Sequence, residues 1–546
     1  MRGRVHPLEH VPEAKAAPQL LILAEPLLRE GLFRLLEPNL KLATTREELC
    51  GSVELVIWSS SADLPFSSLQ RELEQLQERW QPAPVLLLLP GQTPYSSEDL
   101  LRLRCEGLLQ QADPQEIPAA VTTLLAGGRV VELRPLAAST PAPEPIGFGA
   151  WLLRSGLSQI QAEQQRCRHW LEHCGGGLSR LLLLGRLREL AVARRLLLWL
   201  WGPISMAFPE PSQPQAGGSA ETPPGVAITL RQRTAEAVWQ TIQQRLTAAI
   251  AAGVSNQSGQ LLALEGLTEE HRRDLLEALI SQLDLLVTRM RHEQLRGDEL
   301  EQRWLQQQPE LRRLSLRAMA GDYVQLPQQG GLLPVAASLI EASELGGLDP
   351  DLPLAQPMLA ALVQAQPLLV EGRLLAPDEP QALLHLELLI SNWLIRSAEL
   401  ISAEILSCCS NWPELRRYLL RPDLLATRNL ERLRNQLNSQ QRWGSLFERP
   451  VQLYESRRLL YRLEAGSITP LLLTEPRDAE LRQLSWSQQV ITLSLEARDA
   501  LAPQLQSFFR RLGDLVVVVL TQVIGRAIGL VGRGILQGMG RSISRG

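Results

Sequence analysis

Short apolar runs alternate with helical patterns in the first part of the chain. The runs of strand length are residues 19–23, 53–58, 84–89 and 106–110. Helical periodicity is found over residues 26–36 and 69–80, and a further helix is expected to open at Pro114 and to end at Gly127-Gly128. Buried apolar strands that alternate with helices predict a doubly wound parallel sheet with helices on both faces, an α/β fold.

The remainder of the chain has a mainly helical pattern. We expect helices throughout residues 230–308, with Thr268 as the N-cap of one of them. Pro380 is expected to open a long helix that ends near Cys408. Two short β-like runs on either side of Ala465-Gly466-Ser467 predict a small hairpin.

Composition shifts then give the domain boundaries, because stretches rich in Pro, Gly and Ser separate the periodic segments. We divide the chain into a disordered leader (1–17), a sheet domain (18–133), a Pro/Ala linker (134–147), a helical hairpin (148–202), a second linker (203–225), a helical domain (226–447), a C-terminal region with the small hairpin (448–506) and a glycine-rich tail (507–546).

The tail combines an unbroken apolar run with regularly spaced glycines. Residues 515–525 carry no charge and as a helix would span about 16 Å, well short of a hydrocarbon core of about 30 Å. A longer span would place Arg526 near its middle, at a cost of roughly 2.5–3.5 kcal/mol. The pattern favours an amphipathic helix at a membrane surface or against a partner.

The glycines of the tail sharpen this expectation. Each one weakens a solvated helix by roughly 0.5–1 kcal/mol, and close backbone approach to a partner must offset this. The residues that we expect to contact the membrane or the partner are Gly525, Arg526, Gly529, Gly532, Arg533, Gly534 and Gly538. Two alternatives stay open: a buried pair of core helices, and a true span, which the arginines disfavour.

Composition and charge exclude some classes of function. A net charge of −4 gives no electrostatic case for nucleic acid as a partner, although the tail itself is basic. The 6 cysteines form no recognisable disulfide framework and indicate a reducing compartment. The amino-terminal stretch lacks an apolar signal core, so we expect no cleaved signal peptide.

Candidate chemistry is sparse. Residues 167–174 contain two cysteines and two histidines, but on a helix the cysteines lie about 10 Å apart along the axis and the histidines lie on the opposite face. We therefore expect no metal site, no cofactor and no catalytic residues, and an enzyme in the helical region remains only an alternative.

The residues of the first domain resemble a known family. Pro26-Leu27-Leu28-Arg29-Glu30-Gly31-Leu32, then Leu108-Leu109 with Ala112, Pro114 and Glu116, and finally Ala126-Gly127-Gly128-Arg129 are similar to the receiver domain of LuxR-class response regulators. The resemblance covers residues 19 to about 133 and implies a five-stranded doubly wound domain. The alternative is an unrelated sheet of the flavodoxin-like type.

The departures from that family concern its chemistry. The resemblance implies two acidic residues at the end of the first strand, where this chain has Leu23 and Ala24, with Glu25 just beyond. Ser59 stands at the phosphoacceptor position, Leu89 at the switch hydroxyl and Gln110 at the lysine. Phosphoryl transfer needs a carboxylate nucleophile, a metal ion held by oxygen ligands and a cation. We therefore expect a pseudo-receiver that binds a protein partner and accepts no phosphate.

A second resemblance concerns the C-terminal part. Residues 428–437, 493–501 and 519–540 are similar to the hypothetical chloroplast reading frame family of cyanobacteria and red-algal plastids, a domain of unknown function. This resemblance implies a photosynthetic organism. We expect a non-enzymatic scaffold, assembly or regulatory factor, cytoplasmic or stromal, attached peripherally to a membrane such as the thylakoid. A phosphorylation-independent transcriptional or signalling regulator is the alternative, but the chain has no obvious basic recognition helix.

Overall fold

The structure is a computed structural model that describes residues 18–36, 40–44, 51–61, 64–134, 226–328, 331–347 and 349–497. The chain separates into two compact units, Met1–Asn438 with Leu459–Leu472 and Ser439–Arg458 with Leu473–Gly546. The leader, residues 135–147 of the first linker, the helical hairpin of residues 148–202, the second linker and the tail lie outside the described residues, so the predictions for them stay predictions.

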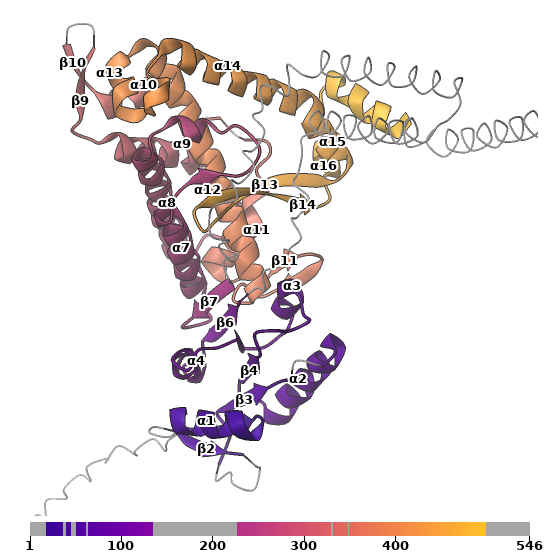
Figure 1. Ribbon diagram of the computed structural model, residues 1–546. Helices are drawn as coiled ribbons and strands as arrows, with labels where there is room; N and C mark the ends of the chain where they lie inside the picture. The colour runs from indigo at the N-terminus through magenta and orange to yellow at the C-terminus, as the bar shows by residue number, and fades with distance from the viewer. Residues whose placement is uncertain are drawn as a thin grey trace, which may run out of the picture. The chain divides into compact units, whose positions relative to one another are not determined.

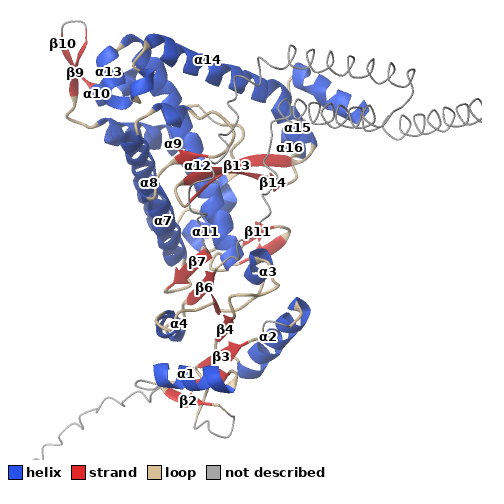
Figure 2. Cartoon of the chain, viewed as in Figure 1, coloured by secondary structure: helices blue, strands red, loops and turns tan. Residues whose placement is uncertain are grey.

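The first unit begins with a parallel sheet, which confirms the α/β class predicted for this part of the chain (Figure 2). Its elements are β1 (Gln19–Leu23), α1 (Pro26–Leu36), β2 (Lys41–Ala43), β3 (Leu55–Ser59), α2 (Phe66–Trp80), β4 (Val85–Leu89), α3 (Ser97–Leu101), β5 (Gly107–Gln110), α4 (Glu116–Leu125) and β6 (Arg129–Leu133). The strand order is β2-β1-β3-β4-β5-β6, with every neighbouring pair parallel.

Alternation along the strands divides their side chains between two helical layers. Leu20 and Ile22 of β1 and Ile57 of β3 belong to a buried cluster that also includes residues of α1 and α4. The intervening residues point to the opposite face, which α2 and α3 cover (Figure 1). Most strand residues are buried, as expected for a parallel sheet between two helical layers.

The sheet has seven strands, two more than the five that the resemblance implies. β6 adds a sixth parallel strand, and β7 (Val226–Leu230) pairs antiparallel with it, from Arg129 opposite Leu230 to Leu133 opposite Val226. The sequence analysis assigned residues 226–230 to the helical domain. Their side chains alternate between exposed and buried, with Ile228 and Leu230 fully covered, which is the pattern of an edge strand.

The rest of the first unit is mainly helical, as predicted (Figure 1). Its elements are α7 (Ala235–Ala251), β8 (Ser255–Asn256), the 3-10 helix η2 (Ala263–Gly266), α8 (Glu269–His292), α9 (Asp298–Ala320), β9 (Gln325–Gln328), β10 (Gly331–Pro334), α10 (Val335–Ala342), α11 (Ala355–Gln364), β11 (Leu368–Val370), β12 (Arg373–Leu375), α12 (Pro380–Cys408), η3 (Cys409–Asn411), α13 (Pro413–Leu419), η4 (Pro422–Leu424), α14 (Thr427–Trp443), β13 (Arg457–Glu464) and β14 (Ser467–Thr474). The helix α14 and both strands of the last pair continue into the second unit.

Several predicted helix boundaries are confirmed at the very residues that were predicted. Thr268 is the N-cap of α8, and its hydroxyl accepts a hydrogen bond from the backbone N–H of His271. Pro380 is the first residue of α12, which ends at Cys408. The prediction of helix throughout residues 230–308 is wrong, because β8 and η2 interrupt it between α7 and α8.

The predicted hairpin is confirmed and extended. β13 and β14 are joined by Ala465 and Gly466, both with positive φ (46° and 78°), as a tight two-residue turn requires. β8 pairs in parallel with β14 and so adds a third strand, with Ser255 opposite Ser467. The interruption between α7 and α8 thus has a structural cause, since it supplies this strand.

A buried carboxylate holds the same interruption against α12. Glu399 accepts hydrogen bonds from the backbone N–H groups of Ala263 and Leu264, both at 2.8 Å, at the start of η2. These donors are the ones that a helix start leaves unpaired. Burial raises the pKa of Glu399 to about 7, even though the two N–H groups and Arg396 favour its charged form.

The second unit contains a π-helical turn and short helices. They are η5 (Gly444–Glu448), α15 (Arg449–Tyr454), α16 (Asp478–Leu481) and a helix over residues 486–497. Arg458 and Arg477, both buried, donate to the carboxylate of Glu480 at 2.6 Å and 2.5 Å. This ion-paired cluster fixes the start of β13 against α16.

Candidate functional site

The receiver-like positions meet at one edge of the sheet, where parallel strands present their carboxyl ends. Leu23 lies opposite Trp58 in the register of β1 and β3, and Ser59 lies opposite Leu88 in the register of β3 and β4. Leu89 lies opposite Gln110 in the register of β4 and β5. In doubly wound sheets this edge is the general location of ligand sites.

The side chains at this edge lack the groups that phosphoryl transfer uses in receivers. Leu23 and Ala24 offer no oxygen ligand for a metal ion, and Ser59 offers a hydroxyl in place of a carboxylate nucleophile. Leu89 is buried and has no hydroxyl. Glu25 follows them in the chain and is exposed, and it is the only acid among the six positions compared with the family's phosphorylation site.

Gln110 has a structural task where the family has a lysine. It is 4% exposed, and its amide Nε2 donates to the carbonyl oxygen of Gly91 and to Oγ1 of Thr93, both at 3.3 Å. These bonds fix the loop that follows β4. Gln110 is neutral, so this position presents no cation toward Ser59. Its amide is instead engaged in holding the loop after β4.

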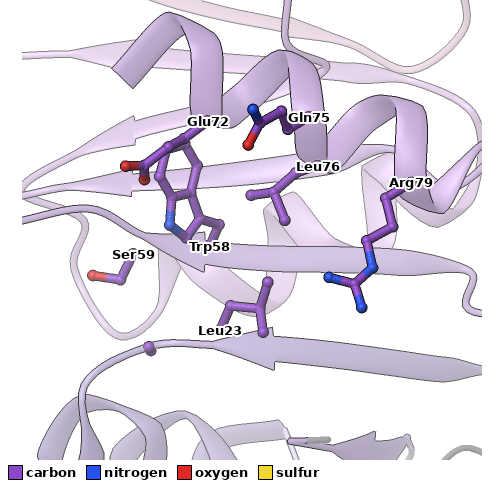
Figure 3. Close-up of a pocket in the computed structure, with 8 residues that line it drawn as sticks. Leu23, Trp58, Ser59, Glu72, Gln75, Leu76 and Arg79 are labelled. Carbon is purple, nitrogen blue, oxygen red and sulfur yellow. The ribbon is translucent and has the colours of Figure 1, made fainter. Parts of the chain in front are cut away.

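A pocket of about 430 Å³ opens beside Ser59 (Figure 3). Figure 3 shows Glu72, Gln75, Leu76 and Arg79 projecting from α2 over the strands that carry Leu23 and Trp58. The full lining is Leu23, Ala24, Trp58, Ser59, Glu72, Gln75, Leu76 and Arg79. The pocket thus has an apolar floor and a rim with one acid, one amide and one cation.

Three of these lining residues, Leu23, Ala24 and Ser59, were predicted from the sequence. Trp58 and the residues of α2 were not predicted. The alternation of β3 was the available signal, since Trp58 must point to the face opposite Ile57. The spacing of Glu72, Leu76 and Arg79 at three and four residues then places them on one side of α2.

A buried ion pair joins the start of β6 to the segment that precedes α12. The Arg129 side chain on β6 is 9% exposed and lies 3.4 Å from the carboxylate of Asp378, which is 15% exposed. Arg233, just beyond β7, lies 3.8 Å from the same carboxylate. This ion pair could not be predicted from the sequence, because its partners are far apart along the chain.

The described residues include neither a reactive thiol among the two buried cysteines nor a cluster of metal-binding side chains. Burial raises the pKa of the Cys105 and Cys409 thiols to about 12, which makes both poor nucleophiles. Within the ranges that the structure describes, no group of three or more His, Cys, Asp or Glu side chains is placed to hold a metal ion. Residues 167–174 lie outside these ranges.

The predicted contact residues of the tail, from Gly525 to Gly538, also lie outside the described residues. In the part of the chain that the structure covers, no helix is both long enough and apolar enough to cross a bilayer. The attachment predicted for the tail therefore stays a prediction.

Two families match separate segments of the chain. Residues 147–201 match the family described as "Cyanobacterial response regulator, helical hairpin domain". Residues 349–540 match a family described as "Protein of unknown function (DUF3685)". Neither description names an enzyme. No solved structure matches the chain.

Curated proteins are also similar to the chain. A "Ycf55-like protein" of Synechocystis sp. is 29% identical over 415 residues, which cover 72% of this chain and 71% of that protein. An "Uncharacterized protein ycf55" of Pyropia yezoensis is 27% identical over 134 residues, and its counterpart in Porphyra purpurea is 26% identical over 140 residues. Each of these two matches covers 42% of the algal protein. The chain is therefore similar over most of its length to a Ycf55-like protein of a cyanobacterium, with a response-regulator hairpin segment beside a receiver-like domain.

Proposed function

We propose that this protein is a non-enzymatic regulatory or scaffold factor of a photosynthetic organism, whose receiver-like domain binds a protein partner without phosphoryl transfer. The observation that carries the proposal is the edge of the sheet. There, Leu23, Ala24, Ser59 and Gln110 occupy the positions of the metal ligands, the nucleophile and the cation. Gln110 is moreover committed to hydrogen bonds within its own loop.

The pocket beside Ser59 supplies the surface for this binding. Trp58 and Leu76 offer apolar contact, while Glu72, Gln75 and Arg79 offer hydrogen bonds and charges at the rim. Such a combination suits one inserted side chain of a partner protein with polar neighbours. The junction of Arg129 with Asp378 supports a scaffold role, since it ties the sheet to the helical part of the same unit.

Photo-crosslinking in cells tests the proposed surface. With p-benzoylphenylalanine in place of Gln75, at the exposed rim, we expect a specific protein adduct. The matched control is the same group in place of Thr122, which is exposed on α4 at the opposite face of the sheet. Equal adducts from both positions, or none from position 75, would count against the pocket as the binding surface.

We further propose that the tail attaches the protein to a membrane or to a membrane protein complex. Its support is the uncharged run of residues 515–525, the small-residue spacing from Gly525 to Gly529 and the surrounding arginines. The family match to residues 349–540 extends through this segment.

Deletion of residues 507–546 should release the protein from pelleted membranes into the supernatant. The reason is that the deletion removes the basic charges and the apolar run together. Salt and carbonate washes of the full-length protein would separate electrostatic from apolar attachment. A full-length protein that is already in the supernatant after gentle lysis, and is monomeric, would refute the attachment.

A further inference from the structure

The helix of residues 486–497 has one packed face and, on the opposite side, an apolar row that is open to solvent. Trp486, Val490 and Leu493 are spaced at i, i+4 and i+7 and therefore lie on one side of the helix. They are 78%, 47% and 60% exposed. Isolated exposed apolar residues are common, but a continuous helical row of them marks a contact surface.

The opposite face of this helix is already packed. Thr492 and Leu495 are 8% and 7% exposed. The start of the helix is fixed by Ser485, whose backbone N–H donates to Oε1 of Gln488 at 3.1 Å, as in a capping box. Gln488 also donates from Nε2 to the carbonyl oxygen of Ser445 at 2.6 Å. The helix cannot rotate to bury its open row without losing these bonds.

We propose that residues 515–525 of the same chain cover the open row of Trp486, Val490 and Leu493. This segment, LVVVVLTQVIG, is uncharged and apolar enough to complement the row. The connection of residues 498–514 reaches up to roughly 50–60 Å when fully extended, so the segment can lie against the helix without strain.

The occupant is the chain's own tail for two reasons. A short connection gives the segment an effective concentration in the millimolar range at the helix, which a second copy at cellular dilution does not match. In addition, one family match covers residues 349–540 and so includes both the row and the segment. The two therefore occur together in a single family domain.

Contact of residues 515–525 with the open row and their attachment to a membrane would use the same apolar side chains. While residues 515–525 lie on the helix, they are not available to a lipid surface or to a membrane protein. The covered state is a closed form, and attachment requires its opening. The closed form itself does not depend on the proposed membrane attachment, because it is a property of the isolated chain in solution.

Photo-crosslinking of the purified full-length protein, without lipid, tests the inference. With p-benzoylphenylalanine in place of Val490, we expect an adduct within one chain, identified by mass spectrometry in residues 515–525. Its yield should be unchanged by roughly hundredfold dilution, because the contact is intramolecular. The matched control is the same group in place of Gln489, which is exposed on the flank of the same helix and should give little adduct to this segment.

Each outcome decides between the two proposals. An adduct in residues 515–525 that falls when anionic liposomes are added supports the closed form and the competition with lipid. The same adduct with no effect of liposomes keeps the closed form but removes lipid as the competitor. An adduct between two chains, or no adduct to residues 515–525, overturns the closed form, and pelleting with liposomes in that case would leave the membrane attachment standing.

Discussion

Asp378→Leu is expected to destabilise the first unit by about 3–5 kcal/mol, because it leaves the charge of Arg129 buried without a partner. The Arg129 side chain is 9% exposed, and among the described residues its Nε has no hydrogen-bond partner, so Asp378 is its main compensation there. Arg233 shares the same carboxylate at 3.8 Å and would lose a partner too. Denaturant unfolding of the full-length protein measures the change.

The chain offers two controls for this substitution. Glu371→Leu breaks the ion pair between Glu371 and Arg102, whose side chains are 56% and 41% exposed. Because both charges stay in water, this substitution is expected to destabilise the first unit by only about 0–1 kcal/mol. The double variant Arg129→Leu with Asp378→Leu removes both buried charges and should recover most of the loss. A loss below about 1 kcal/mol for Asp378→Leu would mean that the junction does not tie the sheet to the helical part.

Glu399 is expected to make the stability of the first unit fall as pH rises. Its pKa is about 7 in the folded chain against an ordinary value of 4.5. Between these two values the folded state binds more protons than the unfolded state, so its stability from this group is highest at low pH and declines until pH passes about 7. From pH 5 to pH 8 this decline amounts to about 2–3 kcal/mol.

Glu399→Gln isolates this contribution, since the amide does not titrate. The difference in unfolding free energy between the native chain and the variant should shift with pH by about the same 2–3 kcal/mol, to the disadvantage of the native chain at high pH. Glu30→Gln, in an exposed ion pair with Arg34, controls for the loss of a surface carboxylate and should change the unfolding free energy by about 0–1 kcal/mol. A pH-independent difference for Glu399→Gln would show that the carboxylate keeps an ordinary pKa where it contacts Ala263 and Leu264.

Much of the fold could be predicted from local pattern. Apolar runs such as residues 19–23 and 84–89 are too short and too continuous for surface helices, and they are buried strands in the structure. Thr268 and Pro380 begin their helices as predicted, because the chemistry of a helix start depends on a few neighbouring residues.

Features that depend on distant partners could not be predicted. Residues 226–230 form a strand only because β6 offers an edge, and a long segment separates the two strands in the sequence. β8 likewise depends on pairing with β14, where Ser255 lies opposite Ser467. A local pattern contains no information on such pairings, so residues 226–230 were assigned to the helical domain and residues 255–256 to a helix.

The candidate site could be predicted in its chemistry but not in its shape. The positions of Leu23, Ser59 and Gln110 follow from the order of strands, so the joint absence of acid, nucleophile and cation was visible in the sequence. The pocket requires the distance between β3 and the side chains of α2 such as Leu76, and this comes only from the packed structure.

Treatment of the full-length protein with acetyl phosphate and Mg²⁺, followed by mass spectrometry of the intact chain and its peptides, measures whether the receiver-like domain accepts a phosphoryl group. A competent receiver treated in parallel serves as the positive control. The absence of a carboxylate nucleophile at Ser59 and of a cation at Gln110 predicts no phosphoryl adduct in residues 18–134. A stable, Mg²⁺-dependent adduct in these residues would contradict the account.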